Sequence, residues 1–350
     1  MPQMPVSQID VIAPNLKRRL SGVTATVARL VPVQARQIGI AATGSGLPAS
    51  LPHISLWRLP FLPRDRWRIW HARRNVEMLL GLVLRGVFRR RLKLVFTSAS
   101  QRQHSGYTKW LISRMDAVVA TSRKTAAYLD QPPTVILHGI DTETFCPPAN
   151  RAALRAGLGL PDTTLVGCYG RIRAQKGTDA FVDAMLLALP SRPQVTALVM
   201  GRATEGHTEF LEELKAKVAA AGLSERILFL PEVTVDQMAD WYRVLDLYVA
   251  PQRWEGFGLT PLEAMACAVP VVATRVGAFE ELVAEGETGA LVPAGDVPAL
   301  AAAAAPYLDD PVYAANAGAA ARARVTSGFR IEDEAAALIR LYRSLLGPVA

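Results

Sequence analysis

The fold is decided by residues 253–273, RWEGFGLTPLEAMACAVPVVA. Gly256 and Gly258 make a turn at which the backbone can come close to a ligand, because glycine has no Cβ. Pro261 suits the first position of a helix, whose free N–H groups would face that turn and attract an anion. The apolar run Val269–Ala273 predicts a buried strand. This order of elements indicates an α/β fold with a ligand site beside the glycine turn.

Two carboxylates, Glu255 and Glu263, flank the turn eight positions apart. Together with the helix start they suit a ligand that carries both phosphate and hydroxyl groups, such as a nucleotide sugar. The alternative is that Glu263 is a solvated carboxylate near a helix N-terminus. The whole string resembles the signature of retaining GT-B glycosyltransferases of family 4, which end in a similar Glu-Gly-Phe-Gly-x4-Glu-Ala-Met-Ala-x3-Pro-Val-Val.

A second motif, GRIRAQKG at residues 170–177, follows an apolar run that predicts a strand. Arg171 and Lys176 can clamp a diphosphate and stabilise the charge that grows on it as a glycosyl bond breaks. Taken alone, the segment could equally be a basic turn. It resembles the family's Gly-Arg-x4-Lys-Gly motif, in which this Arg and Lys hold the donor diphosphate. The segment matches neither a Walker A loop nor a Rossmann Gly-x-Gly-x-x-Gly, which disfavours an ATPase or a dehydrogenase.

Strand-like and helix-like segments alternate along both halves of the chain, which predicts two doubly wound parallel sheets. With the resemblance, the expected fold class is α/β: GT-B, two Rossmann-like domains facing a cleft that binds the ligands. We expect an acceptor-binding domain over residues 1–146 and a nucleotide-sugar-binding domain over residues 147–330. Pro147 and Pro148 mark the linker, and a helix in residues 331–350 is expected to pack back on the first domain.

The expected strands of the first half are Ile9–Ala13, Ile38–Ala42, Ile54–Leu56, Leu92–Thr97, Ala117–Thr121 and Thr134–Leu137. Those of the second half are Leu165–Tyr169, Val195–Met200, Ile227–Leu230, Leu247–Ala250, Val269–Thr274 and Gly289–Val292. Helices are expected over 178–188, 208–221, 234–243 and 331–346.

Composition limits the cellular setting. The three cysteines are scattered without metal-ligand spacing, which is typical of a reducing compartment. The N-terminus lacks the pattern of a signal peptide, and no apolar run reaches the roughly 18 residues that span a bilayer. We therefore expect a cytoplasmic protein, at most peripheral on the inner face of the cytoplasmic membrane.

Charge is unevenly distributed along the chain. Residues 1–150 hold 21 Lys/Arg and 7 Asp/Glu, a net charge of +14, whereas the remainder holds 18 and 24, a net charge of −6. Residues 58–93 alone carry 11 basic and 2 acidic residues, interleaved with tryptophans and an aliphatic run. This pattern favours contact with an anionic membrane or acceptor, the alternative being a core helix with a solvated basic face. No nucleic-acid-binding module is recognisable, so nucleic acid is not an expected partner.

Further candidates lie in the first half. Ser21 could cap a helix, and Gly22 resembles the glycine of the family's first loop, which lies against the donor phosphates. A histidine that contacts the donor sugar in many family members has no direct counterpart, since His104 comes several residues late. The residues kept as possible cleft or acceptor contacts are Gln101, Arg102, His104 and His138.

The resemblance implies roles in the second half. Arg171, Lys176 and Glu255 are the expected catalytic residues, with the leaving-group oxygen taking the acceptor proton. Glu255 and the Phe257-Gly258 backbone would contact sugar hydroxyls, and Glu263 would accept hydrogen bonds from the ribose. The expected donor-binding set is Gly22, Arg171, Lys176, Glu255, Gly256, Phe257, Gly258, Leu259, Thr260 and Glu263. No Asp-x-Asp motif is present, so we expect no metal and no cofactor.

The first half looks most like the bacterial lipopolysaccharide core mannosyltransferases, which implies GDP-mannose as donor and an anionic glycolipid of the Kdo-lipid A type as acceptor. One alternative is a family 4 transferase that uses another GDP- or UDP-sugar with a different lipid or soluble acceptor. Another is a non-catalytic protein that binds a nucleotide sugar or an anionic lipid. The intact Arg171, Lys176, Glu255 and Glu263 argue against the non-catalytic alternative.

Overall fold

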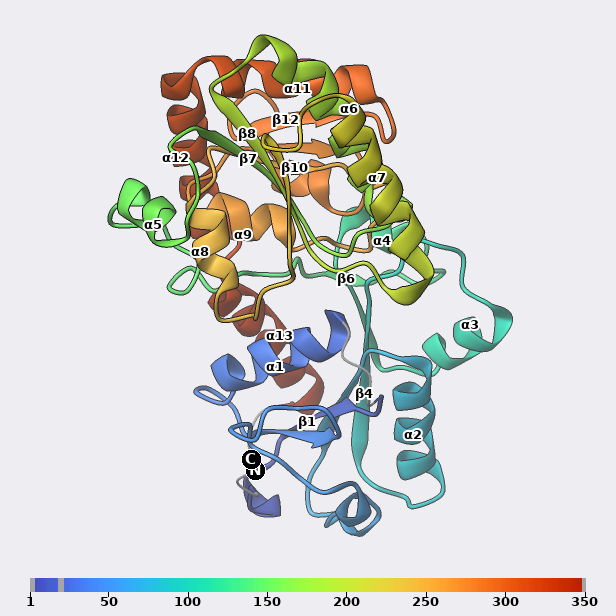
Figure 1. The fold of residues 1–350 in the computed structure, drawn as a ribbon. Helices are drawn as coiled ribbons and strands as arrows, with labels where there is room; N and C mark the ends of the chain where they lie inside the picture. Colours follow the sequence, from blue (N-terminus) through green and yellow to red (C-terminus); the bar gives the residue numbers. More distant parts are fainter. Residues whose placement is uncertain (1–3, 18–21, 348–350) are drawn as a thin grey trace. The chain divides into compact units, whose positions relative to one another are not determined.

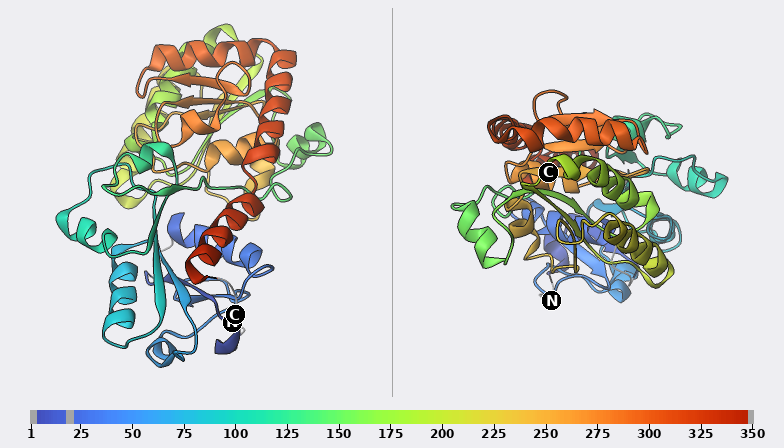
Figure 2. Two further views of the ribbon diagram at one scale, coloured as in Figure 1. Left: turned by 180° about the vertical axis from the view of Figure 1, so that it is seen from behind. Right: turned by 45° about the horizontal axis from the view of Figure 1, so that its top comes forward.

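The chain folds into two units, each built on a six-stranded parallel sheet (Figure 1). The computed structural model describes residues 4–17 and 22–347. The first unit contains residues 1–139 and 331–350, and the second contains residues 140–330. Figure 2 shows the same ribbon from two further directions. The predicted class, α/β with two doubly wound Rossmann-like domains, is confirmed.

The sheet of the first unit has the order β2-β1-β3-β4-β5-β6. Its strands are β1 (Val11–Asn15), β2 (Ile40–Gly44), β3 (Arg68–Ala72), β4 (Leu92–Ser98), β5 (Ala117–Ala120) and β6 (Thr134–Val135). Its helices are α1 (Gly22–Gln34), α2 (Asn75–Gly86), α3 (Gly106–Ile112), α4 (Arg123–Ala126) and α13 (Ile331–Leu346).

Each face of this sheet carries its own core, because successive side chains of a strand point to opposite faces. Val11 and Ala13 of β1 belong to the cluster formed with α1 and α13, whereas Ile12 belongs to the cluster formed with α2. Trp70 of β3 is fully buried on the α2 side, where a Cβ at Gly81 would lie 2.6 Å from its ring. The expected C-terminal helix is present as α13, which packs on α1 and β3.

One expected strand of the first sheet is wrong, and one strand of that sheet was not predicted. Ile54–Leu56 is not a strand, since His53 makes only an isolated bridge to Ala42 and Leu56 begins a 3-10 helix, η2 (Leu56–Phe61). The central strand β3 was not expected at all, because it contains an arginine and a histidine. Both are buried: the Arg68 guanidinium donates hydrogen bonds to the carbonyls of Ile9 and Pro63.

The sheet of the second unit has the order β12-β11-β10-β7-β8-β9. Its strands are β7 (Thr164–Tyr169), β8 (Val195–Met200), β9 (Ile227–Leu230), β10 (Leu247–Ala250), β11 (Val271–Thr274) and β12 (Gly289–Val292). Its helices are α5 (Arg151–Gly157), α6 (Thr178–Ala188), α7 (Thr208–Ala220), α8 (Met238–Arg243), α9 (Thr260–Ala266), α10 (Phe279–Leu282), α11 (Val297–Asp309) and α12 (Pro311–Gly328).

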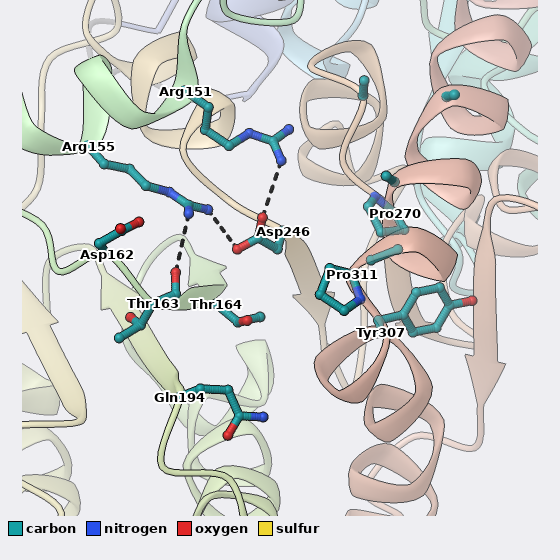
Figure 3. A pocket seen from close by; sticks show the side chains of 14 residues that line it. Arg151, Arg155, Asp162, Thr163, Thr164, Gln194, Asp246, Pro270, Tyr307 and Pro311 are labelled. Carbon is teal, nitrogen blue, oxygen red and sulfur yellow. Dashed lines mark hydrogen bonds and ion pairs between the residues drawn. The ribbon is translucent and has the colours of Figure 1, made fainter.

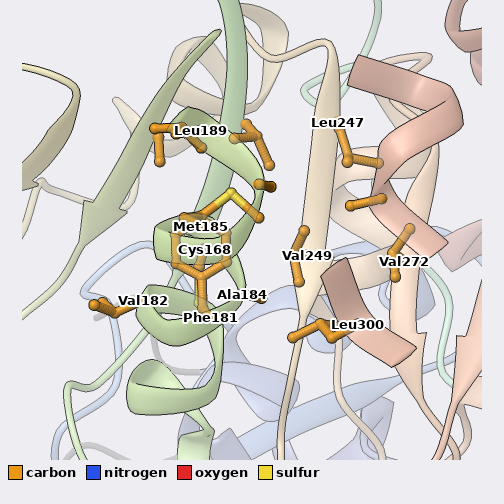
Figure 4. Packing of buried hydrophobic residues seen from close by; sticks show 14 of the residues in the cluster. Cys168, Phe181, Val182, Ala184, Met185, Leu189, Leu247, Val249, Val272 and Leu300 are labelled. Atoms are coloured by element: carbon orange, nitrogen blue, oxygen red, sulfur yellow. The ribbon is translucent and has the colours of Figure 1, made fainter. Parts of the chain in front are cut away.

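The core of this unit lies where α6 and α11 cover the sheet. Phe181 and Met185 of α6 share one buried cluster with Cys168, Val249 and Leu300 (Figure 4). Burying such side chains removes apolar surface from water, which stabilises the folded state by about 25 cal/mol for each Å² buried. The core holds β7 and β10 as neighbours.

The boundary between the units lies at Gly139 and Ile140, before the expected one at residues 146 and 147. The backbone N–H of Ile140 donates to the carbonyl of Phe329 at 2.8 Å, and the Phe145 ring packs edge-on against Tyr242. These contacts bind the segment after Gly139 into the second unit.

Candidate active site

The two motifs of the second half meet at the carboxyl ends of neighbouring strands. The GRIRAQKG loop follows β7 and contains a short 3-10 helix, η3 (Ala174–Lys176), while the loop with Glu255 follows β10. The chain proceeds from β7 outward to β8 and β9, and from β10 outward to β11 and β12 in the other direction. The β7–β10 junction is therefore the point where the strand order reverses, and ligands of open α/β sheets bind there.

Lys176 and Glu255 form an ion pair across this junction. Lys176 Nζ donates to Glu255 Oε2, and the Gly256 amide donates to Oε1 of the same carboxylate at 3.0 Å. The side chains are 20% and 18% exposed, so both can be reached from solvent. The predicted cation and carboxylate thus lie within contact of each other.

Arg253 holds the two loops together. Its guanidinium makes a two-pronged ion pair with Asp179 at 2.6 and 2.8 Å, and its backbone N–H donates to the carbonyl of Gln175 at 3.0 Å. Two parallel hydrogen bonds of this kind fix an orientation as well as a distance. Arg253 and Asp179 are positioning residues that the motif comparison missed.

The glycine turn is required by the packing around it. Gly258 has φ +89°, and a Cβ there would lie 2.3 Å from the ring of Phe279. Gly177 has φ +72°, and its Cβ would lie 1.9 Å from the carbonyl oxygen of Pro251. A side chain at Gly177 would push the two loops apart, and one at Gly258 would displace the ring of Phe279.

The second carboxylate is oriented by a buried tyrosine. Glu263, in the first turn of α9, accepts a 2.8 Å hydrogen bond from the Tyr242 hydroxyl. Burial, and then the Glu263 charge, raise the pKa of Tyr242 well above its ordinary value, so the phenol stays a donor. Tyr242 lies in a cluster of buried rings with Tyr169 and Tyr248. No sequence pattern pointed to Tyr242.

The remaining donor-site candidates surround this pair. Phe257 is buried, and its carbonyl accepts from the Ala278 amide at 3.1 Å, which ties the glycine turn to the start of α10. Leu259 immediately precedes α9 and Thr260 begins it, with Pro261 in the first turn.

Three cations, not two, belong to the GRIRAQKG loop. Arg171 is exposed and makes no hydrogen bond or ion pair with another described residue. Arg173 is half-buried; burial and then the charge of Arg171 lower its pKa, while Glu255 raises it. Its Nε is buried without a partner in the described part of the chain. Arg173 was not among the predicted residues, although the same motif contains it.

The first-unit candidates fall into different environments. Arg102 and His104 line one pocket, whereas Gln101 lies beside it and donates to the Ser122 hydroxyl at 3.5 Å. His138 is buried, with its Nδ1 2.7 Å from Glu334 of α13, and it lines only a cavity of about 10 Å³. The structure therefore gives His138 a place in the core.

Gly22 is the first residue of α1, and a Cβ there would meet nothing within 4 Å. The fold of the first unit does not itself require glycine at this position. Ser21, the expected helix cap, lies outside the described residues.

Another cavity of the second unit, of about 460 Å³, lies at the opposite, amino-terminal ends of the strands (Figure 3). Arg151 and Arg155 reach into it, but both bind Asp246, at 3.2 and 2.6 Å. Asp246 also accepts the Leu165 amide at 2.8 Å. These groups fasten α5 to the sheet, which makes them structural.

Two kinds of feature are absent from the described residues. No cluster of three or more His, Cys, Asp or Glu side chains placed to hold a metal occurs among them. Nor does any helix in the same residues have the length and apolarity needed to cross a bilayer.

Comparisons with known proteins agree with this geometry. The family described as "Glycosyl transferases group 1" matches residues 163–310. The lipopolysaccharide core biosynthesis mannosyltransferase LpsB of Rhizobium meliloti is 56% identical over 97% of this chain and 99% of its own length. LpcC of Rhizobium leguminosarum, of the same description, is 53% identical over 98% of both chains.

Among solved structures, Anabaena Alr3699/HepE in complex with UDP superposes with a TM-score of 0.83 at 21% identity, covering 96% of this chain and all of that one. At that identity the likeness establishes the GT-B fold. The near full-length identity to LpsB and LpcC establishes more. The chain belongs to the group 1 glycosyl transferases, in the family of the lipopolysaccharide core biosynthesis mannosyltransferases, and is a glycosyltransferase.

Proposed function

We propose that this enzyme transfers mannose from GDP-mannose to an anionic lipopolysaccharide core acceptor of the Kdo-lipid A type, with retention of configuration. The observation that carries the proposal is the Lys176–Glu255 pair at the switch point of the second sheet. A cation for phosphate and a carboxylate for hydroxyl groups lie side by side there, as a nucleotide sugar requires. The names of LpsB and LpcC support the choice of sugar and acceptor.

In this proposal the donor lies along the carboxyl edge of the second sheet. Arg171 and Lys176 bind the diphosphate, with the amides around Leu259 and Thr260 assisting. Glu255 and the Phe257-Gly258 backbone contact the sugar, and Glu263 accepts hydrogen bonds from the ribose. The Tyr242 hydroxyl holds that carboxylate in place, because its own donor bond fixes the carboxylate rotamer.

The reaction exchanges two bonds on one face of the sugar. The bond between the anomeric carbon and the diphosphate oxygen breaks, and the bond to the acceptor hydroxyl oxygen forms. The proton of that hydroxyl passes to the departing diphosphate. Negative charge grows on the leaving group, so Arg171 and Lys176 stabilise the transition state more than the bound donor. We propose that these cations replace a metal and that activity survives EDTA.

The acceptor is expected at a membrane surface on the cytoplasmic side. Trp57 and Phe61 of η2 are 70% and 76% exposed, and the neighbouring Trp67, Val87 and Phe88 are also exposed. Arg89 and Arg91 lie exposed next to this group in sequence. Aromatic and basic side chains together favour an anionic bilayer.

Part of the 58–93 segment does not belong to that surface. Trp70 and Arg68 are buried in β3, and Met78 and Leu84 of α2 face the core. Arg90 donates to the carbonyl of Leu62 at 2.5 Å, so its side chain fixes the chain that follows η2. The membrane proposal therefore rests on the exposed aromatic residues and on the exposed arginines alone.

A screen of GDP- and UDP-sugars, with and without the acidic core glycolipid, tests the function. Release of nucleoside diphosphate should require GDP-mannose and the acceptor together, and should be unchanged by EDTA. Preference for another nucleotide sugar would replace the donor, and loss of activity restored by Mg²⁺ or Mn²⁺ would overturn the metal-free mechanism.

A further inference from the structure

A second polar pocket lies in the first unit, at the carboxyl edge of its sheet. It measures about 350 Å³, within the roughly 300–1,000 Å³ of ligand sites. Its lining comes from the ends of three adjacent strands: Lys17 follows β1, Arg73 and Arg74 follow β3, and Ser98 and Ser100 end or follow β4. The chain runs outward from β1 to β2 and, in the other direction, from β3 to β4. The pocket thus lies beside the switch point of this sheet.

The lining is strongly cationic. It includes Lys17, Arg73, Arg74 and Arg102, and none of the residues that line it is Asp or Glu. The buried Glu77 lies close by, where it pairs with Arg74 at 2.9 Å and accepts the Arg73 amide at 2.8 Å. Asp130 acts on the charge of His104 in the same wall. Four positive side chains against these two carboxylates leave the wall with excess positive charge.

Part of this positive charge belongs to side chains that do not help to hold the fold together. Lys17 and Arg102 are exposed, and neither side chain makes a hydrogen bond or ion pair with another described residue. Nε2 of His104, in the same wall, is buried and has no partner in the described part of the chain. The pocket also presents hydroxyl groups of Ser98, Ser100 and Thr108.

An occupant that matches this wall carries an anionic group beside several hydroxyl groups. We propose that the pocket binds the acidic sugar of the acceptor, with Lys17, Arg73 and Arg102 holding its carboxylate or phosphate group. This proposal rests on the proposed function, since it names where the acceptor's charge is recognised. Arg74 acts as a positioning residue, because Asn15, Thr24 and Glu77 already bind its guanidinium.

Acceptor kinetics test the site. Lys17→Gln and Arg102→Gln should each raise the KM for the acidic acceptor about tenfold, the usual effect of losing one charged hydrogen bond. The KM for the donor should stay unchanged, because the donor contacts proposed here lie on the second unit. Arg36→Gln removes an equally exposed charge from the same unit outside the pocket, and should leave both constants unchanged. An unchanged acceptor KM in both pocket variants would overturn the proposal.

Modified acceptors identify the anionic group. One acceptor has its sugar carboxylate converted to the methyl ester, and another has its phosphates removed. The modification that abolishes the difference in acceptor KM between wild type and Arg102→Gln identifies the group that the pocket binds. If the difference survives both modifications, the pocket does not recognise acceptor charge.

A binding measurement separates this proposal from the proposed function. In a Lys176→Ala background, which weakens anion binding at the donor loops, inorganic phosphate should raise the melting temperature more than chloride at equal ionic strength. Adding Lys17→Gln and Arg102→Gln should remove that difference, while adding Arg36→Gln should keep it. Phosphate stabilisation together with no acceptor turnover by the wild-type enzyme would support the pocket and refute the proposed reaction. A phosphate effect that survives the loss of Lys17 and Arg102 would refute the pocket.

Discussion

At the scale of single residues, the Lys176–Glu255 ion pair links two recognition tasks. Each side chain already binds the other, so a diphosphate that takes Lys176 must compete with Glu255. In the proposed donor complex, the displaced carboxylate accepts hydrogen bonds from the sugar.

Lys176→Ala should lower kcat by roughly 10²–10³, the loss expected when one charged donor to a transition state is removed. Steady-state rates with saturating donor and acceptor measure this. Lys215→Ala is the matched control, since Lys215 pairs with Glu212 on the exposed face of α7. A Lys176→Ala enzyme with nearly wild-type kcat would place the diphosphate site elsewhere.

Glu255→Gln should separate binding of the nucleotide from binding of the sugar. Turnover should fall, because the sugar loses its charged acceptor. Affinity for GDP alone should hold or rise about two- to fivefold, since Lys176 no longer has to leave an ion pair. Calorimetric titration with GDP and with GDP-mannose distinguishes an effect on nucleotide binding from an effect on sugar binding. A parallel loss of GDP affinity would show that Glu255 supports the phosphate site itself.

The sequence predicted Lys176 and Glu255 because each lies in a short motif whose residues are close together along the chain. Tyr242 could not be predicted in this way. It lies on α8, and its bond to Glu263 arises only when α8 packs beside α9. Arg253 and Asp179 were missed for the same reason, since their pairing joins the loop after β10 to the first turn of α6.

At the scale of elements, β3 shows how buried polar groups obscure a sequence pattern. His71 of β3 is fully buried, with Nδ1 2.5 Å from the Tyr342 hydroxyl of α13 and Nε2 2.6 Å from the Thr97 hydroxyl. Because Arg68 and His71 are both buried, β3 does not show the usual alternation of buried apolar and exposed polar residues. Helix α13, by contrast, was predictable because its apolar residues recur at helical spacing.

The buried His71 should make stability depend on pH. Burial, and then the charge of Arg73, lower the pKa of His71 well below its ordinary value of 6.5. Above about pH 6.5 the ring is neutral in both the folded and the unfolded chain. As pH falls below about 6.5, only the unfolded chain takes up the proton, so stability falls by up to about 1.4 kcal/mol per pH unit.

Denaturant midpoints of the transition that includes the first unit, between pH 7 and pH 5, check this. His71→Gln should have a lower midpoint at pH 7 and a flatter dependence on pH than the wild type. His207→Gln, in the second unit, should keep the wild-type slope. Equal slopes for His71→Gln and wild type would mean that the His71 ring is protonated in the fold.

At the scale of the whole molecule, charge is segregated by unit along the chain. The first unit holds 23 Lys/Arg and 8 Asp/Glu, a net charge of +15, which leaves −7 for the second. The first unit also holds the exposed aromatic residues of η2. The sequence predicted a basic surface here but could not tell surface from core within 58–93. Trp57 and Trp70 look alike in the sequence, yet one is exposed and the other lies in the sheet.

Trp57→Ser combined with Phe61→Ser should weaken binding to anionic vesicles, because both rings would lose burial in the bilayer interface. Vesicle co-sedimentation should show the loss, and higher salt should weaken the remaining charge-driven binding. Leu187→Ser, an exposed apolar residue of the second unit, is the control. Binding that survives the double change would assign the membrane contact to another surface.

The central claim is that this chain is a retaining mannosyltransferase acting on an acidic core glycolipid. The most direct test incubates the enzyme with GDP-mannose, in which mannose is α-linked, and that acceptor, and determines the anomeric configuration of the product by NMR. The account predicts an α-linked mannosyl product, absent with Lys176→Ala on the same time scale. A β-linked product, or no transfer of mannose to the acceptor, would contradict it.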